Sequence, residues 1–343
     1  MTANLSRAVP SRTDGHDPAE EAGGDRPLVS CVTIFLNAGP YIVEAVESIL
    51  AQEYDRWELL LVDDGSTDES TAIALRFARE HPGKIRYLEH PGHRNRGMSA
   101  SRNLGITHAR GEYVALLDAD DVWLPGKLSA QVAILESRPE AAMTYDATRY
   151  WFPGDPGAPA KERLRKLGFP AGTLVDPPAL VPLFLNGQAE TPGTCSFLIR
   201  RRALDRVGGF VDAFSGLFED QVFFYKVCLE YPVILGEGYS GLYRQHAESC
   251  CQVALKEGTH REDGTGAALD PFLDWLADHV ADRVKAPDSP ARALDAKLKD
   301  YFLRRRGRRR SPIRRAGKLV SRALSLIGPR WPRKGPAASD EAP

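Results

Sequence analysis

The chain has 343 residues and a mass of 37.7 kDa, with 43% hydrophobic and 27% charged residues. This composition is typical of a globular protein, and it excludes collagen-like, wholly disordered and disulfide-framework classes. The formal net charge of −1 hides an asymmetry: 13 Lys and Arg but no Asp or Glu lie between Tyr301 and Ala338, which leaves 32 basic against 46 acidic residues elsewhere. The five cysteines are scattered and odd in number, which favours reduced thiols in a cytosolic protein.

The first 26 residues are rich in Asp, Glu, Gly and Pro and lack the pattern of a secretory signal, so we expect a disordered arm. Short apolar runs then alternate with segments of helical periodicity. Strands are predicted over Leu28–Leu36, Trp57–Val62, Ile85–Leu88, Tyr113–Leu117 and Ala142–Tyr150, and helices over Tyr41–Gln52, Ser70–His81, Ser99–Ala109 and Lys127–Glu136. This alternation predicts an α/β fold with a mostly parallel sheet, in which ligands bind beyond the carboxyl ends of the strands.

The second half of the chain has less regular patterns. We predict a loop over Gly154–Leu174, a strand over Gly193–Ile199, helices over Arg201–Val207 and Phe218–Leu229, and an extended segment over Leu242–His246. Beyond Gly264 the pattern is purely helical, with apolar residues at helical spacing at Phe272, Leu273, Leu276 and Val280. The sequence therefore predicts a C-terminal helical extension.

Acidic side chains follow two of the buried strands. Asp63 and Asp64 end one of them, and Asp118, Asp120 and Asp121 follow another. Asp118 and Asp120 are alternate residues of an extended stretch, so both can converge on one hard cation that keeps positions open for phosphate oxygens. The alternative is that these residues only form turns and caps. A second acidic strand end nearby favours the metal site, because such crowding is unfavourable without a cation.

Three further segments have both a functional and a structural interpretation. Asn95–Gly105 brings glycines, serines and Arg102 to a helix start, which suits either an anionic ligand or a capped surface helix. Glu219 and Asp220 open a helix, where carboxylates are favourable in any case, although a general base also needs such a group. His246 follows an apolar strand and, considered alone, is more typical of a structural role than of a metal ligand.

These motifs occur together and in order. VSCVTIFLN, VDDGSTDES, NRGMSASRNLGI and GEYVALLDADDVWLPGKL resemble family 2 glycosyltransferases of the Rossmann-like GT-A fold. The later GTCSFLIRRRALDRVGGF, FED and YRQH resemble the acceptor half of the same family. The resemblance covers Leu28 to Ser249, and the occurrence of these motifs in order over that span argues against a chance match.

The resemblance implies a nucleotide pocket. Asn37 would line it, Asp64 would accept a hydrogen bond from the base, and Asp63 would support the loop. Arg102 would lie near the nucleotide and its acidic partners. The family commonly has PTYN at the first strand end, whereas this chain has Ile34–Asn37 (IFLN), so the stacking contact of that tyrosine and the identity of the base stay open.

The resemblance also implies a divalent cation, Mn²⁺ or Mg²⁺, on the donor diphosphate. Asp118 and Asp120 match the DxD element, with Asp120 as the direct ligand, and His246 matches a late histidine that completes the metal or diphosphate site. Asp220 matches the general base, and Glu219 would face the acceptor or the donor sugar. One base on the face opposite the leaving diphosphate gives inversion at the anomeric carbon.

We therefore predict a metal-dependent, inverting glycosyltransferase that transfers a sugar from a UDP-sugar to a saccharide or lipid-linked acceptor in cell-envelope polysaccharide or glycolipid synthesis. The alternatives are an inactive nucleotide-sugar-binding homologue and a nucleotidyltransferase. The second alternative needs a Gly-rich loop with a basic residue after the first strand, which Asn-Ala-Gly-Pro-Tyr does not offer. Donor choice is expected to depend on Asn186–Thr194 and acceptor choice on Gly154–Leu174 and the C-terminal helices. No nucleic-acid partner is expected.

The predicted organisation is a disordered arm at 1–26, a GT-A domain at 27–250 with a nucleotide-binding half at 27–150 and an acceptor half at 151–250, a helical extension at 264–303 and a basic amphipathic tail at 304–343. In the tail, Ser311–Ile327 places apolar residues on one side and basic residues largely around the other. Residues 304–334 are therefore expected either to contact an anionic membrane or to pack on the acidic body. We expect a cytoplasmic protein. Contact between the tail and an anionic membrane would bring it to the inner face of the cell membrane.

Overall fold

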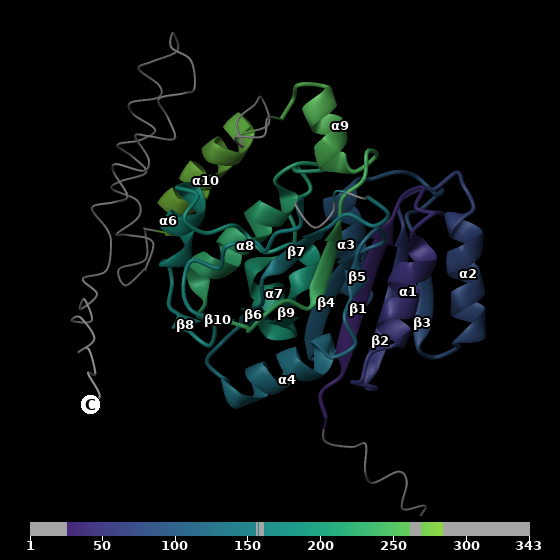
Figure 1. Cartoon of the computed structure of the whole chain (residues 1–343), viewed down its shortest axis with the longest axis horizontal. Coiled ribbons are helices and arrows are strands. Elements are labelled where there is room, and N and C mark those ends of the chain that lie inside the picture. Colours follow the sequence, from purple (N-terminus) through teal and green to yellow (C-terminus); the bar gives the residue numbers. More distant parts are fainter. Residues whose placement is uncertain (1–25, 156, 158–160, 261–268, 284–343) are drawn as a thin grey trace, which may run out of the picture.

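The computed structural model describes residues 26–155, 157, 161–260 and 269–283. In this part of the chain, helices cover both faces of an eight-stranded sheet with the order β3-β2-β1-β4-β9-β6-β10-β8 (Figure 1). A smaller sheet has the order β5-β11-β7. The α/β fold class predicted from the sequence is confirmed.

The first half of the chain alternates strands and helices much as predicted. Its elements are β1 (Val29–Phe35), α1 (Ile42–Leu50), β2 (Trp57–Asp63), α2 (Ser70–Glu80), β3 (Ile85–Glu89), α3 (Met98–His108), β4 (Tyr113–Asp118), β5 (Val122–Trp123), α4 (Lys127–Ser137), β6 (Met143–Tyr145) and β7 (Thr148–Trp151). The second half contains β8 (Leu174–Val175), α6 (Leu180–Leu185), the 3₁₀ turn η2 (Thr194–Ser196), β9 (Phe197–Arg200), α7 (Arg201–Val207), α8 (Glu219–Glu230), β10 (Val233–Leu235), β11 (Gly241–Arg244), α9 (Cys250–Lys256) and α10 (Leu269–Arg283).

The parallel strands β1 to β4 form the half of the sheet that positions the acidic residues. β1 pairs with β2 on one side and with β4 on the other, and its last residues align Phe35 with Asp63 and Ile34 with Asp118. The chain moves outward from β1 through β2 to β3 and then crosses to β4 on the opposite side. This reversal creates a crevice beyond the carboxyl ends of β1 and β4, where open α/β sheets bind ligands.

The remaining strands are mixed in direction. β9 lies antiparallel between β4 and β6, although it follows both of them by many residues in the chain. β10 pairs parallel with β6 and antiparallel with β8. In the small sheet, β11 pairs antiparallel with β5 and parallel with β7, which brings the residues after the acidic turn next to Gly241–Arg244.

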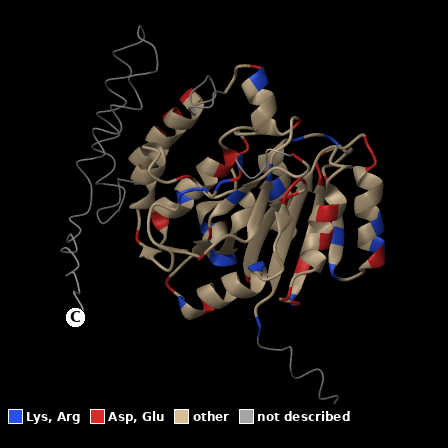
Figure 2. Ribbon diagram, in the orientation of Figure 1, with Lys and Arg blue, Asp and Glu red and all other residues tan. Residues whose placement is uncertain are grey.

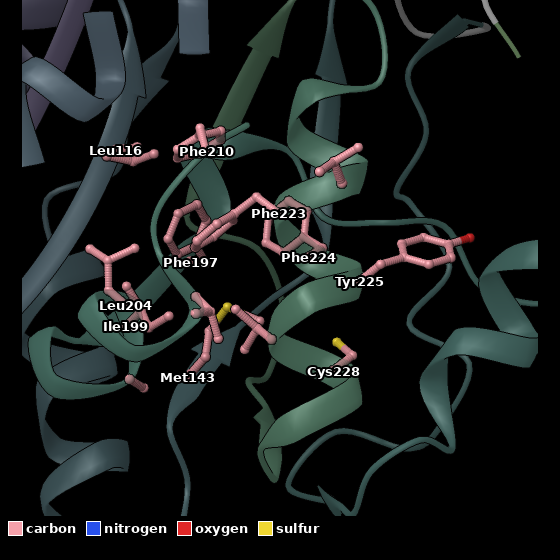
Figure 3. Close-up of a cluster of buried hydrophobic side chains, with 14 of the residues drawn as sticks. Leu116, Met143, Phe197, Ile199, Leu204, Phe210, Phe223, Phe224, Tyr225 and Cys228 are labelled. Carbon is pink, nitrogen blue, oxygen red and sulfur yellow. The ribbon is translucent and has the colours of Figure 1, made fainter. Parts of the chain in front are cut away.

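The core lies on both faces of the large sheet. On one face, α1, α2 and α4 cover alternate residues of β1, β2 and β4, and the apolar residues Ile42, Ala45, Val46 and Ile49 of α1 are fully buried. On the other face, α3, α7, α8 and α10 pack on the intervening residues. Figure 3 shows the centre of this second cluster, where Phe197 of β9 lies 5.7 Å from Phe223 and 5.3 Å from Phe224 of α8, measured between ring centroids. Because both faces are covered, the strands are continuous apolar runs.

Two element predictions were wrong in detail. The segment Gly193–Ile199 is not one strand, because Thr194–Ser196 forms a 3₁₀ turn before β9. Ala142–Tyr150 is divided into β6 and β7, which belong to different sheets. At the first break the backbone N–H of Ser196 donates to the carbonyl oxygen of Gly193, which closes a turn, and at the second break the N–H of Ala147 donates to the carbonyl oxygen of Gly238.

The C-terminal predictions are only partly covered by the described residues. The expected helix is present as α10, in which Phe272, Leu273, Leu276 and Val280 are buried against the α8 side of the core. Residues 1–25, 261–268 and 284–343 lie outside the described residues, and with them the predicted arm and the basic tail. Among the helices that the structure describes, we find none with the length and apolar character needed to cross a bilayer.

Candidate active site

A cleft of ≈ 1400 Å³ opens beyond the carboxyl ends of β1 and β4. Its walls come from the residues that follow these strands, from the start of α8, and from segments 163–166, 187–194 and 246–251. The red segments near the upper ends of the central strands in Figure 2 mark the acidic residues on this side of the sheet. The cleft therefore coincides with the crevice that the strand order creates.

Asp63 and Asp64 end β2, and the protein itself engages both carboxylates. Asp63 is fully buried and accepts two backbone N–H bonds, at 3.1 and 2.7 Å, from the loop that follows it. Asp64 lines the cleft and accepts N–H bonds from Arg96 at 2.7 Å and from Gly97 at 3.0 Å. Asp64 thus fixes the loop before α3 against the end of β2.

Asn37 follows β1 and has the left-handed backbone conformation, with a φ of 51°. Asparagine tolerates this conformation better than most residues. Its Oδ1 accepts the N–H of Thr67 at 2.8 Å, and its own N–H donates to Ser66 Oγ at 3.0 Å. These bonds join the loops after β1 and β2 and leave Asn37 in the wall of the cleft.

Arg102 of α3 connects the end of β4 to the start of α8. Its Nη2 donates to both carboxylate oxygens of Asp118 at 2.8 and 2.9 Å, and its Nη1 donates to Glu219 Oε1 at 2.8 Å. The guanidinium is buried and lies 5.2 Å from the ring centroid of Phe210. Thr194 also donates to Asp118, at 2.9 Å. The charge of Asp118 is therefore balanced inside the protein.

Asp120 and His246 meet at the cleft, 126 residues apart in the sequence. Asp120 Oδ2 lies 3.0 Å from His246 Nε2, and the other ring nitrogen lies 3.2 Å from Glu248 Oε2 and 3.3 Å from the Tyr41 hydroxyl. The hydrogen bond with Asp120, together with the bond to Glu248, raises the pKa of His246 above its ordinary value. The ring is thus oriented by two carboxylates.

Asp121 has a structural position behind the turn. It is buried, and its Oδ1 accepts the backbone N–H of Arg244 at 2.9 Å. The Arg244 guanidinium donates to the carbonyl oxygen of Asp120 at 2.6 Å. Burial raises the pKa of Asp121 well above its ordinary value, and the neighbouring carboxylates add to this. Arg244 of β11 therefore holds the DxD turn through the small sheet.

Glu219 and Asp220 begin α8, where carboxylates interact favourably with the helix dipole. The preceding Phe218 has a φ of 69°, and its buried ring stacks on Phe272 at 5.1 Å. Asp220 lines the cleft, and its Oδ1 accepts the N–H of the next residue at 2.7 Å. Burial raises the pKa of Asp220, which Arg165 opposes, while burial and Asp220 raise the pKa of Glu219 to about 8.

The structure brings most of the predicted site residues to one cleft. Asn37, Asp64, Asp118, Asp120, Glu219, Asp220 and His246 line it, whereas Asp63 and Arg102 lie behind it and hold its walls. The segment predicted for donor choice contains Thr194, the one predicted for acceptor choice contains Arg165, and the YRQH motif contains Arg244. No individual role was predicted for these three residues.

The family model described as "Glycosyl transferase family 2" matches residues 30–208, just over half of the chain. The chain belongs to this family, as its motifs indicated. TuaG of Bacillus subtilis (strain 168), which is named as a glycosyltransferase of teichuronic acid biosynthesis, is 36% identical over 135 residues, which are 39% of this chain and 51% of TuaG. The chain spans less than two thirds of the length of the curated relatives that it matches first.

Two solved structures have the same fold. Residues 1–349 of S. aureus TarS in complex with UDP-GlcNAc give a TM-score of 0.59 at 17% identity, over 80% of this chain and 71% of that one. The mannosyltransferase PcManGT from Pyrobaculum calidifontis, in complex with GDP-Man and Mn²⁺, gives a TM-score of 0.54 at 19% identity, over 88% of this chain and 75% of that one. These likenesses identify the α/β fold as GT-A.

Proposed function

We propose that this glycosyltransferase transfers a sugar with inversion from a UDP-sugar to a hydroxyl group of a saccharide or lipid-linked acceptor, in the synthesis of a cell-envelope polysaccharide or glycolipid. The observation that carries the proposal is the single cleft in which Asp220 faces the same space as Asp120 and His246. The nucleotide sugars bound by TarS and PcManGT support the donor class. The role named for TuaG supports the cell-envelope context.

The side chains in the cleft fit a divalent cation. Asp120 and His246 present a carboxylate oxygen and an imidazole nitrogen 3.0 Å apart, and Mn²⁺ accepts both kinds of ligand. Within the described ranges, no three His, Cys, Asp or Glu side chains form a metal site on their own. We therefore propose that Asp120 and His246 hold Mn²⁺ or Mg²⁺ with Asp118 behind them, and that diphosphate oxygens complete the site. The bound ion would offset charge on the leaving diphosphate.

The remaining roles belong to the chain's own residues. Asp220 would take the proton from the acceptor hydroxyl, because its carboxyl lines the cleft and burial raises its pKa toward the range useful to a general base. Asn37 and Asp64 would contact the nucleoside from the loops after β1 and β2. Arg102 would keep Glu219 and Asp118 in place rather than touch the substrate. Attack from the side of Asp220, opposite the diphosphate, gives inversion.

The test compares donor binding with turnover. Thermal denaturation of the wild type is followed with a panel of nucleoside diphosphates and sugar nucleotides, with and without Mn²⁺, because a ligand that binds only the folded state raises the midpoint. We expect one nucleotide to stabilise the protein in a Mn²⁺-dependent way and Asp120→Ala to abolish this shift. Asp220→Asn should bind the donor like the wild type but lose at least about 100-fold in turnover.

Asp278→Ala, at an exposed position of α10, is the matched control for both variants. Wild-type turnover by Asp220→Asn would remove Asp220 as the base. A panel without any nucleotide-dependent shift would instead contradict the donor site as a whole.

A further inference from the structure

One short segment supplies the positive charge of the cleft. Among the described residues, the lysine and arginine side chains that line the cleft are Arg163, Arg165 and Lys166, all from the loop between β7 and β8. The cleft is also lined by Asp64, Asp118 and Asp120. The basic side chains of the cleft therefore come from one segment, and Arg165 of this segment interacts with Asp220.

The protein does not balance these three charges equally. Arg163 forms a bidentate ion pair with Glu190, with both distances 3.0 Å. Glu190 also accepts the backbone N–H of Lys166 at 3.2 Å, which fixes the segment in place. Arg165 lies close enough to Asp220 for the two charges to interact. Lys166 is exposed and its ammonium group makes no ion pair with any described residue. Its positive charge is therefore not balanced by a carboxylate of the described part of the chain.

Arg165 is held firmly but keeps an unused donor. Its Nη1 donates to the carbonyl oxygen of Thr191 at 2.7 Å, and its guanidinium lies 5.4 Å from the ring of Tyr150 and 5.3 Å from that of Tyr243. Its Nε–H is buried without an acceptor in the described part of the chain. A rigid guanidinium with a free donor, beside an unpaired ammonium group, is an arrangement that recognises anionic oxygens.

We propose that Arg165 and Lys166 form an anion-binding subsite that selects acceptors with a phosphate or carboxylate group close to the accepting hydroxyl. The placement on the acceptor side rests on the proposed function, because it follows from Asp220 as the base that meets this hydroxyl. The subsite would also offset the repulsion between an anionic acceptor and the acidic wall of the cleft. A neutral sugar could accept only neutral hydrogen bonds from these cations, which are weaker than the charge-assisted bonds of an anionic group.

The test measures the binding of three small probes to the full chain saturated with UDP and Mn²⁺. The probes are methyl glucoside, methyl glucuronide and methyl glucoside 6-phosphate, and titration calorimetry gives each dissociation constant. We expect at least one anionic probe to bind about tenfold more tightly than the neutral one, as one charge-assisted contact allows. Tighter binding of methyl glucuronide would indicate an acceptor with a carboxylate group, and tighter binding of methyl glucoside 6-phosphate would indicate an acceptor with a phosphate group.

Variants of the exposed Lys166 connect this preference to the segment. Lys166→Gln should lose most of the anion preference, Lys166→Arg should keep it, and UDP affinity should stay unchanged in both. Arg79→Gln removes one exposed charge from α2 outside the cleft and is the matched control. Equal binding of neutral and anionic probes, or a preference that survives Lys166→Gln, would overturn the subsite.

The same titrations separate this proposal from the proposed function. If Lys166→Gln weakens UDP binding instead, the segment serves the donor diphosphate and the acceptor subsite is wrong. If UDP does not bind the wild type at all, the donor site fails, whereas the anion preference can still be measured without nucleotide and stands or falls by itself.

Discussion

Arg102 is the residue on which the geometry of the site depends most. It is 1% exposed and joins Asp118 to Glu219, which lies 117 positions after Arg102 in the chain. Arg102→Met removes the cation and leaves the carboxylate of Asp118 and the carboxyl group of Glu219 without their hydrogen-bonding partner, so we expect the free energy of unfolding to fall by about 3–5 kcal/mol. Urea denaturation measures this loss. Arg79→Met on the surface of α2 should change stability by less than about 0.5 kcal/mol. A comparably small loss in Arg102→Met would contradict the structural role of Arg102.

Glu219 gives the site a dependence of stability on pH. Burial raises its pKa from 4.5 to about 8, so between these values the folded chain keeps a proton that the unfolded chain has lost. The free energy of unfolding should therefore decrease as the pH rises through this range. Glu219→Gln cannot titrate, so the stability of the wild type relative to this variant should decline between pH 5 and pH 8.

Urea denaturation at several pH values measures this difference, with Glu53→Gln at an exposed position as the control. A wild-type-minus-variant difference that stays constant with pH would show that Glu219 does not titrate in this range.

Sequence motifs located single residues better than the contacts between them. The acidic residues were predictable because Asp63 and Asp118 each end an apolar run, and such strand ends meet at one edge of a parallel sheet. The bond from Thr194 to Asp118 and the approach of Arg165 to Asp220 were not predictable, because each joins segments far apart in the chain. Nothing in local periodicity carries that information.

At the scale of elements, α3 packs closely on the sheet at Gly105. A Cβ atom on Gly105 would lie 2.3 Å from Val32 Cγ1 and 3.1 Å from Val62 Cγ2. Alanine normally favours a helix over glycine, but here overpacking should dominate, and Gly105→Ala should destabilise the protein by about 1–3 kcal/mol. Thr107→Ala, at an exposed position of the same helix, is the control. A more stable Gly105→Ala in urea denaturation would show that α3 can move away from β1 and β2.

The elements that the sequence predicted well are those buried on both faces. β1, β2 and β4 are six or seven residues long and almost wholly buried, so each forms an apolar run with clear ends. β5 and β8 have two residues each, too few for any periodicity to show. Their positions depend on partners from elsewhere in the chain, β11 and β10, which only the folded structure reveals.

At the scale of the whole molecule, the two halves of the chain interleave. The expected division at residue 150 separates β6 and β7 from β9 in sequence, yet β9 lies between β4 and β6 in the sheet. α10 belongs to the same core cluster as α8, which carries Glu219 and Asp220 at its start. The segments before and after residue 150 therefore share one sheet.

The position of β9 also has a consequence for biosynthesis. When Tyr145 leaves the ribosome, β4 and β6 are complete, but the strand that joins them begins only at Phe197. At roughly 5–20 residues per second, the nascent chain waits about 3–10 s with the edges of β4 and β6 that face β9 unpaired. Unpaired edges invite association with other chains. Chaperone protection during this interval should matter more for this protein than for one whose strands pair in the order in which they are made.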